Sequence, residues 1–557
     1  MEESNITQFS LLKPTNAAEE FRLSDSTAND LSVSFLAEHI THNQTEREIV
    51  RKLLTDMPVS ADIIRYRQDV YTELRENPEL STQLYEIFDS MRFLVNDRPT
   101  FIGETPTILE LMSYFRSTQH YINCILKLRE AVGNRSFRSE GLKRFSAYLD
   151  EIYDGSGFDE LKKDIEELGD EDITRIRSLS IGVNLDQDFQ PHTTGILSIN
   201  NYYFDEESLL KHFAAFLKKD QINTKPDHPL TMNVHKDGLD WIERHFPNWA
   251  GVGRPADSTL MNNLNSIIER MLPSLTKKLR TFMDRHTDLS GKALGKLADE
   301  MLFYQRFIEL EQKLKGIGIS CSIGAVSETD TVLRDFCNLK LAICRAEGTL
   351  AEEIVCNDVE FTREKTVWIL TGPNRGGKTI LTQGIGLAFL LFQCGVFIPA
   401  SSAEIRPCSG IYTHFPVEEE RTVALGRLGE EAERFRGICK TADSSSLLLF
   451  NESFATTSHS ESLYIAEDVL KYLCCLGART CFNTHMHELA ANAEQFGRTE
   501  GAVCGAVSVV MENDNGRRSY KISCKQPDGK SYAHEIACQY GITFEQLLQQ
   551  HEKGGES

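Results

Sequence analysis

The chain has no excess of basic residues, and this limits the partners that it can hold by charge. Lys and Arg number 60 against 82 Asp and Glu, so the formal net charge is −22. Division at Leu350 leaves both parts acidic, with net charges of −14 and −8. Bulk charge therefore does not hold this protein on a nucleic acid or an anionic lipid surface. A polyanionic partner has to meet a local basic patch or be enclosed geometrically.

Long apolar runs and paired cysteine motifs are also missing. The longest apolar stretch, Leu387 to Ala400, is shorter than the ~20 residues that a membrane-spanning helix needs. The start, Met1-Glu2-Glu3-Ser4, has no basic region followed by an apolar one, so no secretory signal is indicated. The 14 cysteines include no C-x-x-C pair, which favours reduced thiols over disulfides or structural zinc. We expect a cytoplasmic protein without a membrane partner.

What the chain does contain is an ordinary globular composition, with 41% hydrophobic and 25% charged residues. Its 557 residues allow several domains. Residues 1–25 are polar and typical of a loose leader. Apolar residues then recur at helical spacing over most of residues 26–335, with breaks predicted at Asn77-Pro78 and near Ser290-Gly291. Within that region, Ser178 to Phe204 alternates and predicts a small pair of strands.

After Leu350 the pattern changes to short apolar runs that alternate with helices. Val367–Leu370, Leu447–Phe450 and Thr480–Asn483 are candidates for buried strands, and each is followed by a polar loop and then a helix. This order is typical of a parallel α/β sheet. We therefore predict an α + α/β multidomain fold, in which an all-helical region precedes an α/β domain at 336–557.

A glycine-rich segment between the first of these strands and its helix satisfies the pattern G-x-x-x-x-G-K-[ST]. Glycines allow backbone N–H groups to converge on a phosphate, the lysine neutralises the β and γ oxygens, and the threonine hydroxyl reaches Mg²⁺. The segment predicts a P-loop that binds ATP. Its candidate residues are Gly372, Pro373, Asn374, Arg375, Gly376, Gly377, Lys378 and Thr379.

The second strand leads into Asn451-Glu452, where nucleotide hydrolases of this type normally carry Asp-Glu. Asn451 offers an amide oxygen near the metal together with Thr379, but no negative charge, so we expect weaker Mg²⁺ binding and slow turnover. Glu452 is the candidate catalytic base for the attacking water. The alternative is that Glu452 is a solvated strand end.

The third strand delivers His485, which we predict to be catalytic through a contact with the γ-phosphate. His487 lies two residues further on, so an alternative is that the two histidines bind a metal. A loop histidine without a special role is the more ordinary interpretation.

Four segments carry a resemblance to a known family. They are Thr371-Gly-Pro-Asn-Arg-Gly-Gly-Lys-Thr379, Leu448-Leu-Phe-Asn-Glu452 with Thr457-Ser458, Asn483-Thr-His-Met-His-Glu-Leu489 and Gly529-Lys-Ser-Tyr-Ala533. In this order and spacing they resemble the ATPase domain of the MutS family of DNA mismatch-repair proteins. Asn357-Asp358 is similar to the entry into that domain. Residues 61–70 and 297–304 are similar to the family's helical core and lever helices.

The resemblance implies an ABC-like P-loop ATPase domain at 336–557 and a helical core and lever domain at 26–335. It also implies ATP and Mg²⁺ as cofactors, DNA as a partner, and a homodimer formed through the ATPase domains. The family's mismatch-reading and connector domains have no counterpart before the core, so mismatch specificity is not expected. A clamp that encircles DNA would come from about residues 170–260. Arg427 lies where the family has a Ser-Thr-Phe element, and it acts either across the dimer interface or as a helix cap.

We therefore predict a dimeric, ATP-switched clamp that binds DNA in repair or recombination and hydrolyses ATP slowly. Lys218, Lys219, Lys277 and Lys278 are either DNA contacts or a solvated helix face. The alternative function is a nucleotide-binding regulatory or structural interaction protein that no longer binds DNA. An unrelated ABC-type ATPase would share the P-loop but would not explain Asn357-Asp358 and Ser531-Tyr532.

Overall fold

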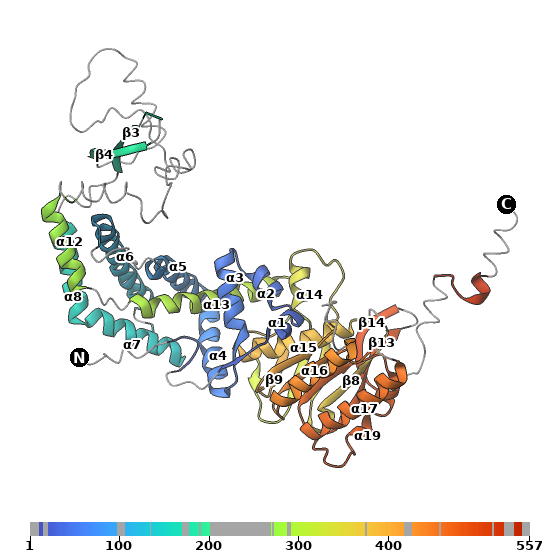
Figure 1. The fold of residues 1–557 in the computed structure, drawn as a ribbon. Coiled ribbons are helices and arrows are strands. Elements are labelled where there is room, and N and C mark those ends of the chain that lie inside the picture. Colours follow the sequence, from blue (N-terminus) through green and yellow to red (C-terminus); the bar gives the residue numbers. More distant parts are fainter. Residues whose placement is uncertain are drawn as a thin grey trace. The chain divides into compact units, whose positions relative to one another are not determined.

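The computed structural model resolves the chain into two compact units, which are described separately. Unit 1 comprises Met1–Tyr85, Arg135–Phe145 and Asp299–Ser557, and unit 2 comprises Glu86–Asn134 and Ser146–Ala298 (Figure 1). The structure describes residues 10–14, 20–96, 106–133, 135–169, 178–185, 187–188, 191–200, 269, 272–286, 291–373, 376–416, 426–455, 458–514, 517–527 and 540–547.

Unit 2 is built from helices and one strand pair. Its elements are α6 (Ile108–Val132), α8 (Ser156–Gly169), α12 (Pro273–Arg285), β3 (Ser178–Leu185) and β4 (Pro191–Asn200). A capping box in which Thr107 and Glu110 bond each other's backbone N–H begins α6. Phe115 packs edge-on against Phe282 with ring centroids 5.6 Å apart, which joins α6 to α12. β3 and β4 pair antiparallel, which confirms the predicted strand pair.

Three helices contribute residues to both units: α5 (Pro78–Asn96), α7 (Glu140–Asp154) and α13 (Gly291–Gly316). The predicted break at Asn77-Pro78 is confirmed, since the preceding helix ends at Glu76. Proline begins α5 because the first turn of a helix needs no backbone N–H donor there. The predicted break near Ser290-Gly291 is also confirmed, with α12 ending at Arg285 and α13 beginning at Gly291.

The N-terminal part of unit 1 is helical. It consists of β1 (Glu20–Arg22), α1 (Asp25–Asp30), α2 (Val33–Ile40), α3 (Gln44–Thr55), β2 (Asp56–Pro58) and α4 (Ala61–Glu76). A buried ion pair joins α3 to α13, because Arg306 donates to both carboxylate oxygens of Glu46 at 2.9 and 3.0 Å. Tyr71 of α4 donates to Glu311 at 2.6 Å. These buried polar contacts fix how α3, α4 and α13 pack.

A small sheet follows α13 with the strand order β5-β9-β6-β7. Its strands are β5 (Ala325–Val326), β6 (Thr331–Phe336), β7 (Asn357–Phe361) and β9 (Ser402–Ile405), and α14 (Leu339–Ala346) and the short 3-10 helix η3 (Arg363–Lys365) lie beside them in sequence. β6 pairs antiparallel with both β7 and β9. This sheet forms one side of the cavity described below.

The main sheet of unit 1 has six strands in the order β10-β11-β12-β8-β13-β14. They are β8 (Val367–Thr371), β10 (Ile411–His414), β11 (Leu447–Asn451), β12 (Arg479–Asn483), β13 (Ala506–Asp514) and β14 (Arg517–Cys524). All neighbouring strands are parallel except β13 and β14. The three predicted strands are confirmed as β8, β11 and β12, and every residue of these three is buried.

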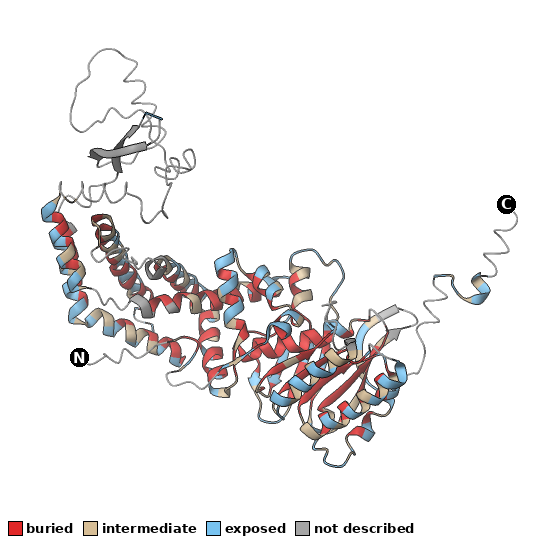
Figure 2. Ribbon diagram, in the orientation of Figure 1, coloured by how far each residue is buried: buried red, intermediate tan, exposed pale blue. Residues whose placement is uncertain are grey.

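Helices cover both faces of this sheet (Figures 1 and 2). They are α15 (Lys378–Gln393), α16 (Gly426–Thr441), α17 (His459–Leu476), α18 (His487–Ala491) and α19 (Ala493–Phe496). α15 packs on one face, where a β-carbon at Gly386 would lie 2.6 Å from Leu449 and 2.4 Å from Leu31. The other face packs Leu448, Phe450 and Phe482 against α17, α18 and α19. The α and α/β content predicted from the sequence is thus confirmed. Within the described part of the chain, no helix is both long and apolar enough to span a membrane.

Candidate functional site

The loop after β8 turns sharply into α15 by means of two glycines with positive φ. Gly372 has φ 146°, and a β-carbon there would lie 2.6 Å from that of Met511 on β13. Gly377 has φ 95° and is the N-cap of α15. Side chains at these positions would introduce strain or a clash. The turn therefore aims the backbone N–H groups that begin α15 at the carboxyl end of the sheet, where helix N-termini favour anions.

Lys378 is a buried cation at this turn. Its Nζ donates to the carbonyl oxygens of Gly372 at 3.1 Å and Pro373 at 3.2 Å, and its side chain is almost fully enclosed. Burial lowers the pKa of Lys378, and the nearby Glu452 carboxylate opposes that shift. The ammonium is thus held at the turn by two neutral carbonyls, and a phosphate would supply the negative charge that these contacts lack.

Thr379 and Asn451 bring two oxygen atoms together at the end of β11. The Thr379 hydroxyl donates to Asn451 Oδ1 at 2.9 Å, and the Asn483 amide donates to the same oxygen. Asn451 and Asn483 are register partners on β11 and β12. Asn483 is fully buried, and its own Oδ1 has no hydrogen-bond partner. The role of Asn483 was not predicted, although its place at the end of a buried strand beside Asn451 is a sequence signal that would have found it.

Glu452 and His485 form a hydrogen-bonded pair next to these oxygens. His485 Nε2 lies 2.6 Å from Glu452 Oε1, and both side chains are partly exposed. The hydrogen bond from His485 lowers the pKa of Glu452, with Lys378 contributing to the same effect. Glu452 is therefore a carboxylate at neutral pH, in the protonation state that a catalytic base requires.

The turn that carries Glu452 is strained and is held by buried polar contacts. Glu452 and Phe454 have φ values of 51° and 62°, a region that side chains rarely adopt. His414 Nδ1 lies 2.7 Å from Ser453 Oγ, and its Nε2 lies 3.1 Å from the carbonyl oxygen of Glu431. The Glu431 carboxylate accepts from the backbone N–H of Phe454 at 2.8 Å.

Burial lowers the pKa of His414 to about 4, so this ring is neutral. His414 and Glu431 were not identified from the sequence, because no motif marks them. They position the turn that carries Glu452 through hydrogen bonds to the two residues that follow it, Ser453 and Phe454.

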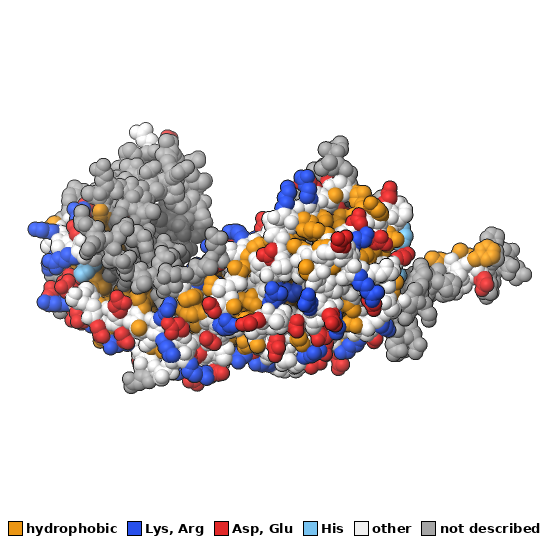
Figure 3. Space-filling view, turned by 90° about the horizontal axis from the view of Figure 1, so that it is seen from below, with side chains coloured by type: hydrophobic (Ala, Val, Ile, Leu, Met, Phe, Trp, Pro, Cys, Tyr) orange, Lys and Arg blue, Asp and Glu red, His pale blue; other side chains and the backbone are white. Residues whose placement is uncertain are grey.

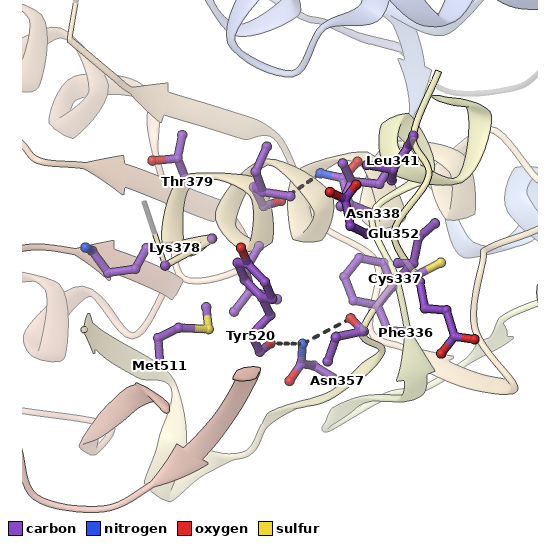
Figure 4. A pocket seen from close by; sticks show the side chains of 18 of the residues that line it. Phe336, Cys337, Asn338, Leu341, Glu352, Asn357, Lys378, Thr379, Met511 and Tyr520 are labelled. Carbon is purple, nitrogen blue, oxygen red and sulfur yellow. Dashed lines mark hydrogen bonds between the residues drawn. The ribbon is translucent and has the colours of Figure 1, made fainter. Parts of the chain in front are cut away.

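A cavity of about 480 Å³ opens beside Lys378, Thr379 and Glu452 (Figure 4). We call the part lined by Gly376–Leu381 and Glu452 the loop end, and the part lined by Phe336, Cys337, Asn357 and Tyr520 the strand end. The remaining lining includes Met511 and residues 350 and 352–355. Its volume lies within the range of small-molecule sites in proteins.

Two asparagines fix the walls of this cavity. Asn338 Nδ2 donates to the carbonyl oxygen of Ile380 at 2.7 Å, which ties α14 to the first turn of α15. Asn357 Nδ2 donates to the carbonyl oxygen of Tyr520 at 3.0 Å (Figure 4). Asn357 Oδ1 accepts from the N–H of Ile522 at 2.9 Å. The Tyr520 ring lies over Gly377, where a β-carbon would come within 3.2 Å of it. Tyr520 was not predicted as a site residue.

The donor set suits a magnesium ion only in part. Thr379 Oγ1 and Asn451 Oδ1 are oxygen donors 2.9 Å apart, and Mg²⁺ prefers oxygen ligands. Sites of this type usually also carry a carboxylate, but neither Thr379 nor Asn451 supplies one. The adjacent acid, Glu452, is hydrogen-bonded to His485. Among the described residues, no group of three or more His, Cys, Asp or Glu is placed to hold a metal. The two residues fit a metal that is held chiefly through phosphate and water.

Most of the predicted site residues lie together. The structure brings Lys378, Thr379, Asn451, Glu452 and His485 to the carboxyl ends of β8, β11 and β12. Gly372, Pro373, Gly376 and Gly377 form the described part of the predicted phosphate loop. Asn374, Arg375, Ser531, Tyr532, Lys218, Lys219 and the side chain of Arg427 lie outside the described residues.

Two family models match this chain. Residues 368–552 match MutS domain V, and residues 59–317 match the MutS2 N-terminal domain. Together they cover most of the helical and α/β parts.

Proteins with similar sequences carry related names. The chain is 32% identical over 215 residues to an Endonuclease MutS2 of Geobacillus sp. (strain WCH70), which covers 38% of this chain and 27% of the relative. It is 28% identical over 279 residues to a DNA mismatch repair protein MutS of Clostridium botulinum (strain Okra / Type B1), covering 47% and 29%. An Endonuclease MutS2 of Streptococcus equi subsp. equi (strain 4047) is also 28% identical over 279 residues, covering 49% and 35%. The chain thus spans about a third of the length of these curated relatives.

Proposed function

Because the chain belongs to the MutS family, we propose that it is an ATP-hydrolysing, DNA-binding protein that acts as a dimeric, ATP-switched clamp in DNA repair or recombination. The observation that carries this proposal is the convergence of Lys378, Thr379 and the Glu452–His485 pair at one edge of a parallel sheet, beside a cavity of about 480 Å³. Ligands of α/β sheets bind at this edge.

In this proposal the triphosphate lies at the loop end of the cavity. The Lys378 ammonium and the backbone N–H groups that begin α15 bind its oxygens, since both lie at this turn. Glu452 takes the proton from the attacking water because it is ionised and lies next to Lys378. His485 holds the Glu452 carboxylate through their hydrogen bond, and it contacts the γ-phosphate once ATP is bound.

Thr379 and Asn451 are the residues that would hold Mg²⁺. When bound, the ion neutralises part of the phosphate charge. Asn451 contributes a dipole in place of a charge, so we propose that metal binding is weak and hydrolysis slow. The protein then spends most of its cycle in the ATP-bound state.

The remaining features of the proposal concern assembly. ATP closes two ATPase domains, residues 336–557 of each chain, on each other, and Arg427 is the candidate contact across that interface. The core and lever region at 26–335, with a clamp at about 170–260, transmits the change to DNA. Of the predicted leader at 1–25, the described residues pack into unit 1, since Leu11 and Leu12 are buried and β1 pairs with β2. MutS2-like and MutS-like relatives are named for endonuclease and mismatch-repair roles. For this chain we propose DNA binding.

A second candidate function is a nucleotide-binding regulatory protein that does not bind DNA. It is favoured by the net charge of −22. On the face drawn in Figure 3, the described Lys and Arg side chains are intermingled with Asp and Glu. A clamp that encloses DNA can work with such a surface, because it does not depend on electrostatic attraction to hold the DNA. A protein that binds DNA in an open groove does depend on that attraction.

A DNA-retention experiment separates the two functions. The full chain is incubated with linear, mismatched and branched DNA over a salt series, with and without ATP. The clamp predicts a complex that ATP makes more resistant to salt on at least one DNA form. No retained complex on any form at low salt would contradict it and favour the regulatory function.

A further inference from the structure

Two cysteines face each other at the strand end of the cavity. β6 and β7 pair antiparallel with Phe336 opposite Asn357. The next pair outward in this register is Cys337 opposite Cys356, because each strand advances by one residue in opposite directions. Cys337 lines the cavity wall next to Phe336 and Asn338 (Figure 4).

The backbone geometry of this pair suits a disulfide. The N–H of Cys337 donates to the carbonyl oxygen of Pro399 at 3.0 Å, and the carbonyl of Cys356 accepts from Lys521 Nζ. Both bonds go to residues other than the opposite cysteine, and the two cysteines lie one position beyond Phe336 and Asn357, the last pair of the ladder. From this we infer a non-hydrogen-bonded cross-strand pair. Such pairs have Cα atoms about 4.5 Å apart, and disulfides span Cα separations of about 4.4 to 6.8 Å. The two thiols also lie close enough for each to shift the pKa of the other.

The two thiols differ in exposure and acidity. Cys356 is half-buried, whereas Cys337 is 4% exposed. The neighbouring Cys337 thiol lowers the pKa of Cys356 to about 7, with Lys521 acting in the same direction and burial and Asp335 against it. The same neighbourhood, together with burial, raises the pKa of Cys337. Accessible, acidic thiols beside a second cysteine are the ones that peroxides oxidise first.

We propose that Cys337 and Cys356 are a redox modification site, in which a peroxide converts the two thiols into a reversible cross-strand disulfide. The Cys356 thiolate attacks one peroxide oxygen, which breaks the O–O bond and leaves a sulfenic acid and a hydroxide that takes the proton lost from Cys356 to become water. The Cys337 sulfur then attacks the Cys356 sulfur, and the displaced hydroxide leaves as the second water with the Cys337 thiol proton. Hydrogen peroxide is thus reduced to two waters while two thiols become one disulfide, and a dithiol reductant restores the starting state.

The disulfide would act on the nucleotide cavity, and this part of the inference rests on the proposed function. Cys337 is followed by Asn338, which holds the first turn of α15, and Cys356 precedes Asn357, which holds Tyr520. A covalent bond between the strands fixes the separation of these two walls and turns the Cys337 sulfur out of its place in the lining. We expect ATP affinity to fall at least about threefold on oxidation and to recover on reduction.

Peptide mapping after mild oxidation tests the disulfide directly. The full chain is treated with hydrogen peroxide, its fold is monitored by circular dichroism, and cross-linked peptides are identified by mass spectrometry. We expect a Cys337–Cys356 peptide in the parent and in Cys524→Ser, which removes an exposed cysteine on β14. The peptide should be missing from Cys337→Ser and Cys356→Ser. A folded, oxidised parent without that peptide would overturn the proposal.

An ATP titration of the reduced and oxidised parent tests the regulatory part. Equal affinities in both states, with the disulfide present, would overturn the effect on the cavity. Absence of ATP binding to the reduced parent would instead contradict the proposed function, while the peptide map would still decide whether the disulfide forms. Recovery of affinity with dithiothreitol in the parent, and no change on oxidation in Cys356→Ser, is the expected pattern.

Discussion

At the loop end of the cavity, Lys378, Thr379 and Glu452 all follow buried parallel strands of one sheet. At the strand end, Phe336, Asn357 and Tyr520 come from three strands in two different sheets. The first set is brought together by a rule of topology, since parallel strands end at one edge. The second set depends on individual side-chain contacts such as the bond from Asn357 to the Tyr520 carbonyl. Substitutions at the two ends of the cavity should therefore differ in their effects on nucleotide binding.

The largest effect is expected at the loop end, from Lys378→Ala. This change removes a buried ammonium that contacts two loop carbonyls and feels the field of Glu452. We expect about a 100-fold loss of ATP affinity, or about 2.7 kcal/mol, measured by equilibrium titration. The control is Lys365→Ala, because Lys365 lies before β8, at the opposite end of that strand. Unchanged affinity in Lys378→Ala would exclude this loop as the phosphate site.

The pH dependence of unfolding tests whether buried contacts support the loop end. The pKa of His414 is about 4 in the folded chain against an ordinary value of 6.5. The unfolded chain therefore binds more protons below pH 6.5, and stability falls as pH decreases from there toward 4. Between pH 7 and pH 5 this group should cost about 2 kcal/mol of unfolding free energy.

His414→Gln keeps polar groups opposite Ser453 and Glu431 but does not titrate. Denaturant unfolding at both pH values should show a smaller loss of stability in this variant than in the parent. An equal loss in both proteins would mean that His414 does not carry the dependence.

The strand end should respond to Tyr520→Ala with a smaller and more selective loss. The ring lies over Gly377 and lines the cavity, and an aromatic contact contributes about 0.5 to 1.5 kcal/mol. We expect about a tenfold loss of ATP affinity with unchanged affinity for inorganic triphosphate, measured by competition. Tyr464→Ala removes an exposed ring on α17 and serves as the control. Equal losses for ATP and triphosphate would assign Tyr520 to the loop end.

The smallest effect is expected from restoring the usual charge beside Thr379. Asn451→Asp keeps the acceptor that Thr379 and Asn483 bond and adds a carboxylate. We expect turnover of ATP to rise about threefold in saturating Mg²⁺, measured as phosphate release. Asn492→Asp makes the same change at a helix end away from β11. A fall or no change in Asn451→Asp would mean that the site is adapted to the amide.

The residues of the loop end share a motif and a strand pattern, so their convergence could be predicted from the sequence. β8, β11 and β12 were recognised as short candidates for buried strands, and their carboxyl ends place Lys378, Glu452 and His485 together. The strand end was not identified, since Tyr520 lies 163 residues from its partner Asn357. Its strand, β14, pairs antiparallel and has no buried apolar run.

Residues that position others were missed for a similar physical reason. His414 is buried by packing against Phe454 and by bonds to Ser453 and Glu431. No local spacing connects these positions, because they lie on β10, the turn after β11 and α16. The pairing of Cys337 with Cys356 likewise depends on the register of β6 and β7. Only a three-dimensional register reveals such pairs.

The most direct test of the account is hydrogen exchange of the full chain with and without ATP and Mg²⁺. If ATP binds in this cavity, it should protect backbone amides at both ends, in the first turn of α15 and in the strands that carry Asn357 and Tyr520. Protection at both ends should be lost together in Lys378→Ala. If saturating ATP left the exchange of both segments unchanged in the parent, this cavity would not be the nucleotide site, and the ATP-switched clamp would be contradicted.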